Sequence, residues 1–276
     1  MAVKTEMVRP LIAIPAYNEE RNIAALLSRL HPWKNDVIVI DDGSTDRTAS
    51  LVKNLGFDCF SNKVNLGLSG FYSTAGKYAL EHGYTHIIAL DADGQHEPDH
   101  IPEFIGKLHQ FELVSGDRFH DLNGIPESKI ASNLFAILLF REILGISLPD
   151  VACGFRGVHI DAIPEGHDSA RFGIIYEMLA KHALAGKPIG LVRIGAIYRP
   201  GTPMNTNIPE ILGLLSVVRK YSADRSVAMV MESVMDRKEF RMDLSGFEFR
   251  ATFEPPGAYL FRTELLKARD FLNSIH

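Results

Sequence analysis

Ile87-Ile-Ala-Leu-Asp-Ala-Asp-Gly-Gln-His-Glu97 is the stretch of sequence that decides the fold. Four apolar residues end abruptly in Asp91 and Asp93, and Gln95 follows two places later. Ligands of an open α/β sheet bind just beyond the carboxyl ends of its strands, so this pattern places oxygen atoms where a ligand would sit. Carboxylate and amide oxygens suit Mg²⁺ or Mn²⁺ shared with phosphates. The alternative is an ordinary acidic turn after a strand, because Asp and Gly are common turn residues.

Apolar runs and helical spacing elsewhere predict alternating strands and helices, which is typical of a doubly wound α/β sheet. The other expected strands are Val8–Ile14, Val37–Ile40, Phe57–Ser61, Leu113–Ser115 and Gly190–Tyr198. The expected helices include Thr48–Leu55, Tyr72–Glu81, Pro98–Leu108, Lys129–Leu144 and Arg171–Ala185. Two stretches, Asn65–Phe71 and Asp150–Arg156, are expected to be a loop and a turn-rich segment.

The character of the chain changes at about residue 205. A helix is expected around Ile208–Val218, and the alternation over Glu239–Phe253 predicts a hairpin that turns at Ser245-Gly246. Glu264–Ile275 is expected to form a last helix. We therefore predict a main domain over residues 1–205 and a small α+β extension over residues 206–276, whose role the sequence does not define.

Composition limits the classes of partner. The formal net charge of −5 over 276 residues disfavours a nucleic acid bound through a broad basic face. Two cysteines are too few for a disulfide framework. Without a signal sequence or a run of about 18 apolar residues, a cytoplasmic protein is expected. Peripheral contact with the inner membrane face and assembly into a homo-oligomer both stay open at this point.

Several motifs occur in a fixed order: Pro15-Ala-Tyr-Asn-Glu19, Asp41-Asp-Gly-Ser44, Asn65-x-Gly67, Asp91-Ala-Asp-Gly-Gln95, Gly116-Asp-Arg118 and Cys153-Gly-Phe-Arg156. Over roughly residues 8–205 this set resembles the inverting family-2 glycosyltransferases of GT-A fold. Within them it is most similar to the dolichyl- or polyprenyl-phosphate mannose and glucose synthases. The resemblance implies a Rossmann-like, mostly parallel sheet flanked by helices. It also implies metal-dependent transfer of a hexose from a nucleotide-diphosphate sugar to polyprenyl phosphate.

The resemblance also implies roles for individual residues. The nucleotide sugar would be bound by Pro15, Tyr17, Asn18, Glu19, Ile40, Asp42, Asp91, Ala92, Asp93 and Arg199. The metal, Mg²⁺ or Mn²⁺, would be bound by Asp93 and Gln95, and the acceptor by Arg118, Lys129 and Arg156. The residues expected to act in catalysis are Asp93, Arg118 and Asp150. A surface ion pair is the alternative for Arg118, and a buried structural role is the alternative for Arg156. His96 is expected in a solvated loop, and an approach to the sugar is its alternative.

Donor and acceptor are left open by the sequence. GDP-mannose is the first expectation for the donor, and a UDP-sugar is the second. A saccharide hydroxyl in cell-envelope polysaccharide synthesis is the alternative acceptor, and it would need a carboxylate base such as Asp150. A non-catalytic sugar-nucleotide-binding protein and a scaffold that assembles through its tail are the readings from other classes. A nucleotidyltransferase is disfavoured because no Gly-rich, Arg- or Lys-bearing loop follows the first strand.

Overall fold

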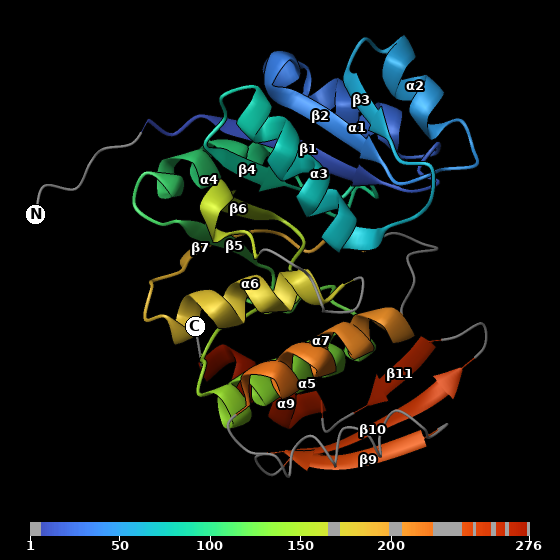
Figure 1. The fold of residues 1–276 in the computed structure, drawn as a ribbon. Coiled ribbons are helices and arrows are strands. Elements are labelled where there is room, and N and C mark those ends of the chain that lie inside the picture. Colours follow the sequence, from blue (N-terminus) through green and yellow to red (C-terminus); the bar gives the residue numbers. More distant parts are fainter. Residues whose placement is uncertain are drawn as a thin grey trace, which may run out of the picture. The chain divides into compact units, whose positions relative to one another are not determined.

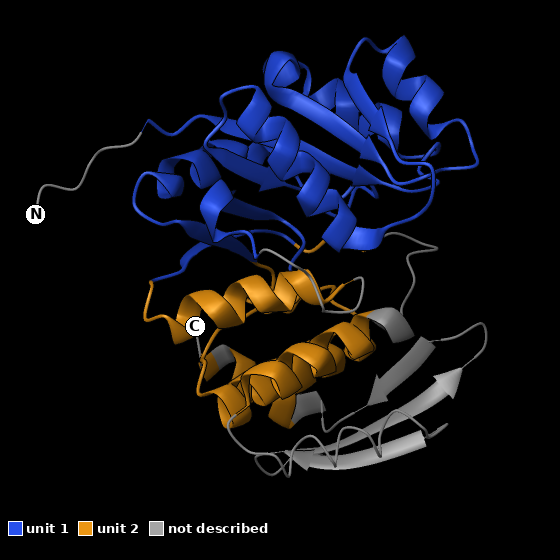
Figure 2. Ribbon diagram, in the orientation of Figure 1, with its two compact units in different colours: residues 1–116, 153–165, 188–195 blue, residues 117–152, 166–187, 196–276 orange. Residues whose placement is uncertain are grey.

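The computed structural model describes residues 7–164, 172–198, 206–222, 239–244, 247–254, 258–262 and 265–274. Two compact units can be separated within it (Figure 2). Unit 1 contains residues 1–116, 153–165 and 188–195, and unit 2 contains residues 117–152, 166–187 and 196–276. The chain therefore passes between the units several times. The domain boundary expected at residue 205 stays a prediction.

Unit 1 is built on a seven-stranded sheet with the order β3-β2-β1-β4-β6-β5-β7 (Figure 1). Its strands are β1 (Pro10–Ala16), β2 (Val37–Asp41), β3 (Asp58–Ser61), β4 (His86–Ala89), β5 (Leu113–Asp117), β6 (Arg156–His159) and β7 (Gly190–Arg193). The first four strands pair in parallel, whereas β6 is antiparallel to β4 and to β5. The mostly parallel α/β sheet predicted from the sequence is confirmed.

Helices cover both faces of this sheet because its central strands are apolar on both faces. On one face, residues such as Ile12, Ile14 and Val39 join a buried core with α1 (Ile23–Arg29), α2 (Thr48–Asn54) and α4 (Ile101–Leu108). On the other face α3 (Gly67–Glu81) packs against β1, β2 and β4. Short 3₁₀ turns at His31–Asp36, Pro98–His100 and Ile160–Ala162 complete the connections.

The structure corrects several boundaries. Helix α3 begins at Gly67, so the loop expected over Asn65–Phe71 is already helical for most of its length. The strand expected over Gly190–Tyr198 ends at Arg193. Strand β6 was not predicted, because Arg-Gly-Val-His is too short and too mixed to show a period of two.

Unit 2 contains α5 (Glu127–Leu144), α6 (Gly173–Leu184), α7 (Ile208–Tyr221) and α9 (Leu265–Ser274). It also contains a four-stranded antiparallel sheet in the order β8-β11-β10-β9. These strands are β8 (Thr206–Asn207), β9 (Glu239–Leu244), β10 (Phe247–Glu254) and β11 (Ala258–Arg262). The predicted hairpin corresponds to β9 and β10, while β8 and β11 were not predicted. Among the described residues, every helix is too short or too polar to cross a bilayer.

Candidate functional site

Three neighbouring parallel strands bring the sequence motifs to one edge of the sheet in unit 1. Ala16 of β1 is in register with Asp41 of β2, and Ala13 of β1 is in register with Ala89 of β4. Parallel strands end at the same edge, so the segments that follow β1, β2 and β4 are neighbours there. The grouping expected from the sequence is therefore present for the segments that begin at Tyr17, Asp42 and Leu90.

The loops after β1 and β2 are tied together by reciprocal hydrogen bonds. Asn18 has φ +57°, the left-handed conformation that Asn tolerates better than most residues. Its backbone N–H donates to the Ser44 hydroxyl (2.9 Å), and its side-chain oxygen accepts from Thr45 N–H (2.9 Å). One residue on, Glu19 N–H donates to the Thr48 hydroxyl (2.8 Å). Asn18 therefore fixes the path of both loops.

The side chains expected around the base differ in exposure. Tyr17 is 47% exposed, so its ring is available to a ligand. Pro15 and Asn18 are partly and largely exposed, respectively, whereas Ile40 and Ala92 are buried. Ile40 in this conformation is therefore part of the core beneath the rim, and direct contact with a ligand would have to come from its neighbours.

Asp42 anchors the loop that leads into α3. One of its carboxylate oxygens accepts from the Asn62 side-chain amide (2.9 Å) and from Leu66 N–H (2.9 Å). The other oxygen accepts from Gly67 N–H (2.7 Å) at the start of α3, where a negative charge is favourable. Gly67 itself has φ +71°, which favours glycine. The geometry therefore gives Asp42 a loop-holding role, beside the ribose contact expected from the sequence.

Carboxylates accumulate around Asp93. Gln95 donates to both Asp93 oxygens, from its backbone N–H (2.9 Å) and from its side-chain amide. Burial, followed by the nearby Asp91 carboxylate, raises the pKa of Asp93. Burial is also the main cause that raises the pKa of Glu19, with Asp93 and Asp91 adding to it. Concentrated negative charge of this kind is relieved when a cation binds.

This group of oxygen donors fits a divalent cation of the Mg²⁺ or Mn²⁺ class. Asp93 offers a carboxylate, and Gln95 offers an amide whose oxygen can face a cation once the group is rotated. Among the described residues, no three His, Cys, Asp or Glu side chains are arranged as a complete metal site. An ion held by Asp93 and Gln95 would therefore take its remaining ligands from substrate phosphate and water.

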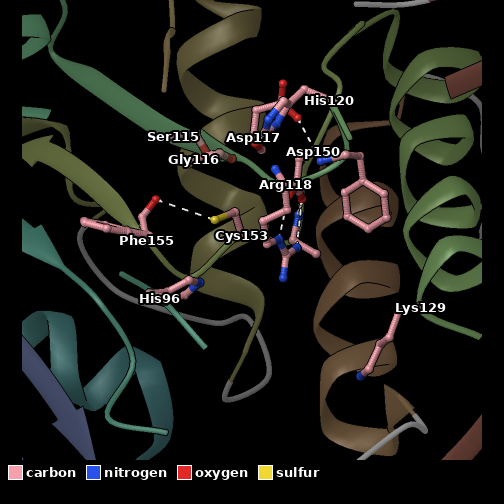
Figure 3. A network of polar contacts seen from close by, with 12 residues as sticks. His96, Ser115, Gly116, Asp117, Arg118, His120, Lys129, Asp150, Cys153 and Phe155 are labelled. Carbon is pink, nitrogen blue, oxygen red and sulfur yellow. Dashed lines mark hydrogen bonds and ion pairs between the residues drawn. The ribbon is translucent and has the colours of Figure 1, made fainter. Parts of the chain in front are cut away.

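Arg118, which is partly exposed, and the buried Asp150 form an ion pair in unit 2 (Figure 3). Arg118 Nε and Nη2 donate to the two Asp150 oxygens at 2.7 and 3.0 Å. The same carboxylate accepts from Ala152 N–H (3.0 Å), and Asp150 is fully buried. Engaged on both oxygens, Asp150 is poorly placed to take a proton from a substrate, so the geometry favours orientation of Arg118 over the base role expected for it.

The two other acceptor candidates have different surroundings. Lys129 lies half-buried in the first turn of α5 (Figure 3). Arg156, in unit 1, is fully buried, and its Nε donates to the Cys153 carbonyl oxygen (2.7 Å). This placement favours the structural alternative for Arg156, and its acceptor role stays a prediction. Arg199 lies outside the described residues.

Three residues at the site were not singled out as functional from the sequence. His96 is 4% exposed and lies beside Asp91, so the expectation of a solvated histidine is wrong. Gly154 lies directly against the Asp91 carboxylate. Tyr72 of α3 is buried in the field of Asp91 and Arg156. The glycine gave a signal as part of Cys153-Gly-Phe-Arg156, and His96 gave one by following Gln95.

Comparison with known proteins agrees with this geometry. The model of the family "Glycosyl transferase family 2" matches residues 11–166. An undecaprenyl-phosphate mannosyltransferase of Micrococcus luteus is 28% identical over 206 residues, which are 70% of this chain and 85% of that protein. The dolichol-phosphate mannosyltransferase of Saccharomyces cerevisiae is 28% identical over 202 residues, 64% of this chain and 72% of that protein.

A solved structure shares the fold. It is glucosyl-3-phosphoglycerate synthase of Mycobacterium tuberculosis in complex with Mn²⁺ and UDP-glucose. The TM-score is 0.60 at 16% sequence identity, over 93% of this chain and 86% of that chain. At this identity the likeness concerns the fold alone.

Proposed function

Because the chain belongs to glycosyl transferase family 2, we propose that it transfers a hexose from a nucleotide-diphosphate sugar to a polyprenyl phosphate, with Mg²⁺ or Mn²⁺ as cofactor. The observation that carries the proposal is that three carboxylates, those of Glu19, Asp91 and Asp93, lie near one another at the carboxyl edge of the sheet. GDP-mannose is the first candidate donor and a UDP-sugar the second.

The donor would lie across the ends of β1, β2 and β4. Tyr17 presents an exposed ring for the base, and the Asn18 network holds the loop that carries it. Asp91 would accept hydrogen bonds from the ribose. Asp93 and Gln95 would hold the divalent ion, whose chemistry is to neutralise the charge that develops on the leaving diphosphate.

The acceptor would approach the anomeric carbon from the side opposite the diphosphate, so that a single displacement inverts the configuration there. A phosphate monoester is already anionic at pH 7 and needs no strong base. A reaction without a base is consistent with the surroundings of Asp150, which is buried and paired with Arg118. Arg118, held by Asp150, would position the acceptor phosphate, with Lys129 as a second candidate.

Names of the relatives support a phosphate-bearing acceptor. The Micrococcus and yeast proteins are named for undecaprenyl phosphate and dolichol phosphate. A polyprenyl phosphate is the proposed acceptor for this chain because both of these relatives are named for one.

A thermal-shift panel tests the donor and the metal together. GDP-, UDP- and dTDP-sugars are added with and without Mn²⁺ to the wild type, Asp93→Ala and Asp99→Ala. A ligand that binds the native state raises Tm by mass action. We expect a Mn²⁺-dependent shift with one nucleotide, lost in Asp93→Ala and kept in Asp99→Ala, whose carboxylate is 81% exposed and lies outside the site. No shift with any donor would contradict the proposal.

Transfer with the donor so identified tests the acceptor. Radiolabelled sugar is followed into undecaprenyl phosphate in detergent, into 3-phosphoglycerate and into water as the blank. Label in the organic phase supports the polyprenyl phosphate. Label in phosphoglycerate alone would assign a soluble phosphate acceptor, and label in neither would return the saccharide hydroxyl to consideration.

A further inference from the structure

The turn that precedes β6 touches the Asp91 carboxylate through a glycine. A Cβ atom built on Gly154 would lie 2.2 Å from Asp91 Oδ2, 2.9 Å from its Cγ and 3.0 Å from its Oδ1. All three distances are at or below the shortest approach of real Cβ atoms. Gly154 is therefore required by space, because any side chain at this position must move the carboxylate or the turn.

The turn is held by contacts on several sides, so we expect the carboxylate to be the part that moves. Arg156 is fully buried and donates to the Cys153 carbonyl oxygen at 2.7 Å, which closes the turn. The Phe155 ring stacks on Phe104 of α4 with centroids 4.2 Å apart and planes at 6°. Gly116 N–H donates to the Phe155 carbonyl oxygen (2.9 Å), which ties the turn to β5.

His96 encloses Asp91 from another side. Its Nδ1 accepts a long hydrogen bond from Asp91 N–H (3.4 Å) and lies 3.6 Å from Asp91 Oδ2. The His96 side chain is almost fully buried, whereas the Asp91 side chain is 37% exposed. Asp91 is therefore confined between the Gly154 backbone and the His96 ring, with one face open to solvent.

We propose that Gly154 is a positioning residue for the donor: without a side chain, it lets the Asp91 carboxylate rest on the Cys153–Arg156 turn in the orientation that meets the nucleotide. The inference deepens the proposed function and rests on it for the role of Asp91. Arg156 contributes by closing the turn through its Nε, which donates to the Cys153 carbonyl oxygen.

A double-mutant cycle tests the proposal. Gly154→Ala is made in the wild type and in Asp91→Ala, where the obstructed carboxylate is gone. Gly157→Ala, in β6, is the matched control, because its Cβ would meet the apolar Leu108 side chain of α4 at 3.0 Å and leave Asp91 untouched. Donor Kd in the presence of Mn²⁺ and the urea midpoint are measured for every variant.

We expect Gly154→Ala to weaken donor binding about tenfold or more in the wild type and less than about twofold in Asp91→Ala, since only groups in contact couple. The urea midpoint should fall in the wild type and fall less in Asp91→Ala. Gly157→Ala should lower the midpoint and leave donor Kd within about twofold of the wild type.

An equal loss of affinity in both backgrounds, or an unchanged affinity in the wild type, would overturn the proposal. If the wild type bound no donor, the proposed function would fail by itself. The urea midpoints would then still decide whether residues 91 and 154 are coupled. If the effects of the two substitutions on the midpoint were additive, the contact between Gly154 and Asp91 would be refuted, and the inference with it.

Discussion

The Asp93 carboxylate is expected to lower the stability of the metal-free protein although the proposed function needs it. A carboxyl whose pKa is raised in the folded state contributes stability below its ordinary pKa of 3.8, and that contribution is lost as the pH rises through the folded value. At pH 7 without metal, ionised Asp93 therefore destabilises the fold. Asp93→Asn should raise the Tm of the metal-free protein and lower transfer by about 100-fold or more.

Differential scanning fluorimetry in EDTA at pH 5 to 8 measures this effect, with Asp99→Asn as the exposed control. The gain in Tm should grow with pH for Asp93→Asn and stay near zero for Asp99→Asn. A lower Tm for Asp93→Asn at pH 7 would mean that the carboxylate stabilises the empty site.

His86 gives the free energy of unfolding a pH dependence opposite to that of Asp93, because its pKa is lowered in the folded state. Burial, followed by the charges of His159 and His109, lowers its pKa to about 4. The neutral ring is thus favoured by folding, so its contribution is complete above pH 6.5 and is lost as the pH falls from 6.5 to about 4. The difference between the pKa values of 6.5 and about 4 corresponds to about 3 kcal/mol in the free energy of unfolding.

Urea unfolding between pH 7.5 and pH 4.5 checks this. His86→Gln should flatten the fall in the free energy of unfolding, and His31→Gln, an exposed control, should keep the wild-type slope. Parallel slopes for wild type and His86→Gln would assign the acid sensitivity to other groups.

At the scale of elements, Asn18 joins the loop after β1 to the loop after β2. Asn18→Ala removes the bond to Thr45 and places a Cβ-bearing residue without a polar side chain at φ +57°, at a cost of about 1–2 kcal/mol. Asn18→Gly removes the bond but accepts the conformation. Donor affinity should fall about tenfold in both variants, whereas urea unfolding should show most of the stability restored in Asn18→Gly. Donor affinity restored by glycine would show that conformation alone matters.

Helices α6 and α7 approach each other through glycines. A Cβ on Gly213 would lie 2.6 Å from Gly173 N, a contact of backbone with backbone. Lys220 and Tyr221 at the end of α7 both donate to the buried Glu177 of α6, at 2.7 and 3.1 Å. The pair is therefore fixed at two places along its length.

Gly213→Ala should cost about 2–3 kcal/mol in urea unfolding, because neither backbone can yield cheaply. Gly106→Ala in α4 is the control, since a Cβ there meets nothing within 4 Å and should stabilise by about 0.5–1 kcal/mol. Equal effects of the two substitutions would contradict the close approach.

At the scale of the whole molecule, net charge predicts how the protein meets a membrane. A charge of −5 gives no general attraction to anionic lipid, so binding should depend on the acceptor headgroup. We expect co-sedimentation at low salt with anionic vesicles that contain undecaprenyl phosphate, and little with the same vesicles without it. Absence from both pellets would count against the lipid acceptor.

The sequence predicted the parts of the fold that follow a repeating pattern. Continuous apolar runs located β1, β2 and β4, and their parallel pairing brought Asp42, Asp91 and Asp93 to one edge. What it missed depends on tertiary contacts between distant segments. Gly154 is needed because Asp91 lies against it, and the buried His96 ring lies beside Phe155, a residue about sixty positions later in the chain.

That return of the chain has a consequence for synthesis. Strand β6 lies between β4 and β5 in the sheet but follows both in the chain, with residues 118–155 made in between. On the ribosome, β4 and β5 emerge first. Their edges that pair with β6 stay unpaired until β6 emerges, and unpaired strand edges are prone to aggregation. Nascent chains halted near residue 150 should therefore need chaperones, and release from them should begin once Arg156–His159 has left the exit tunnel.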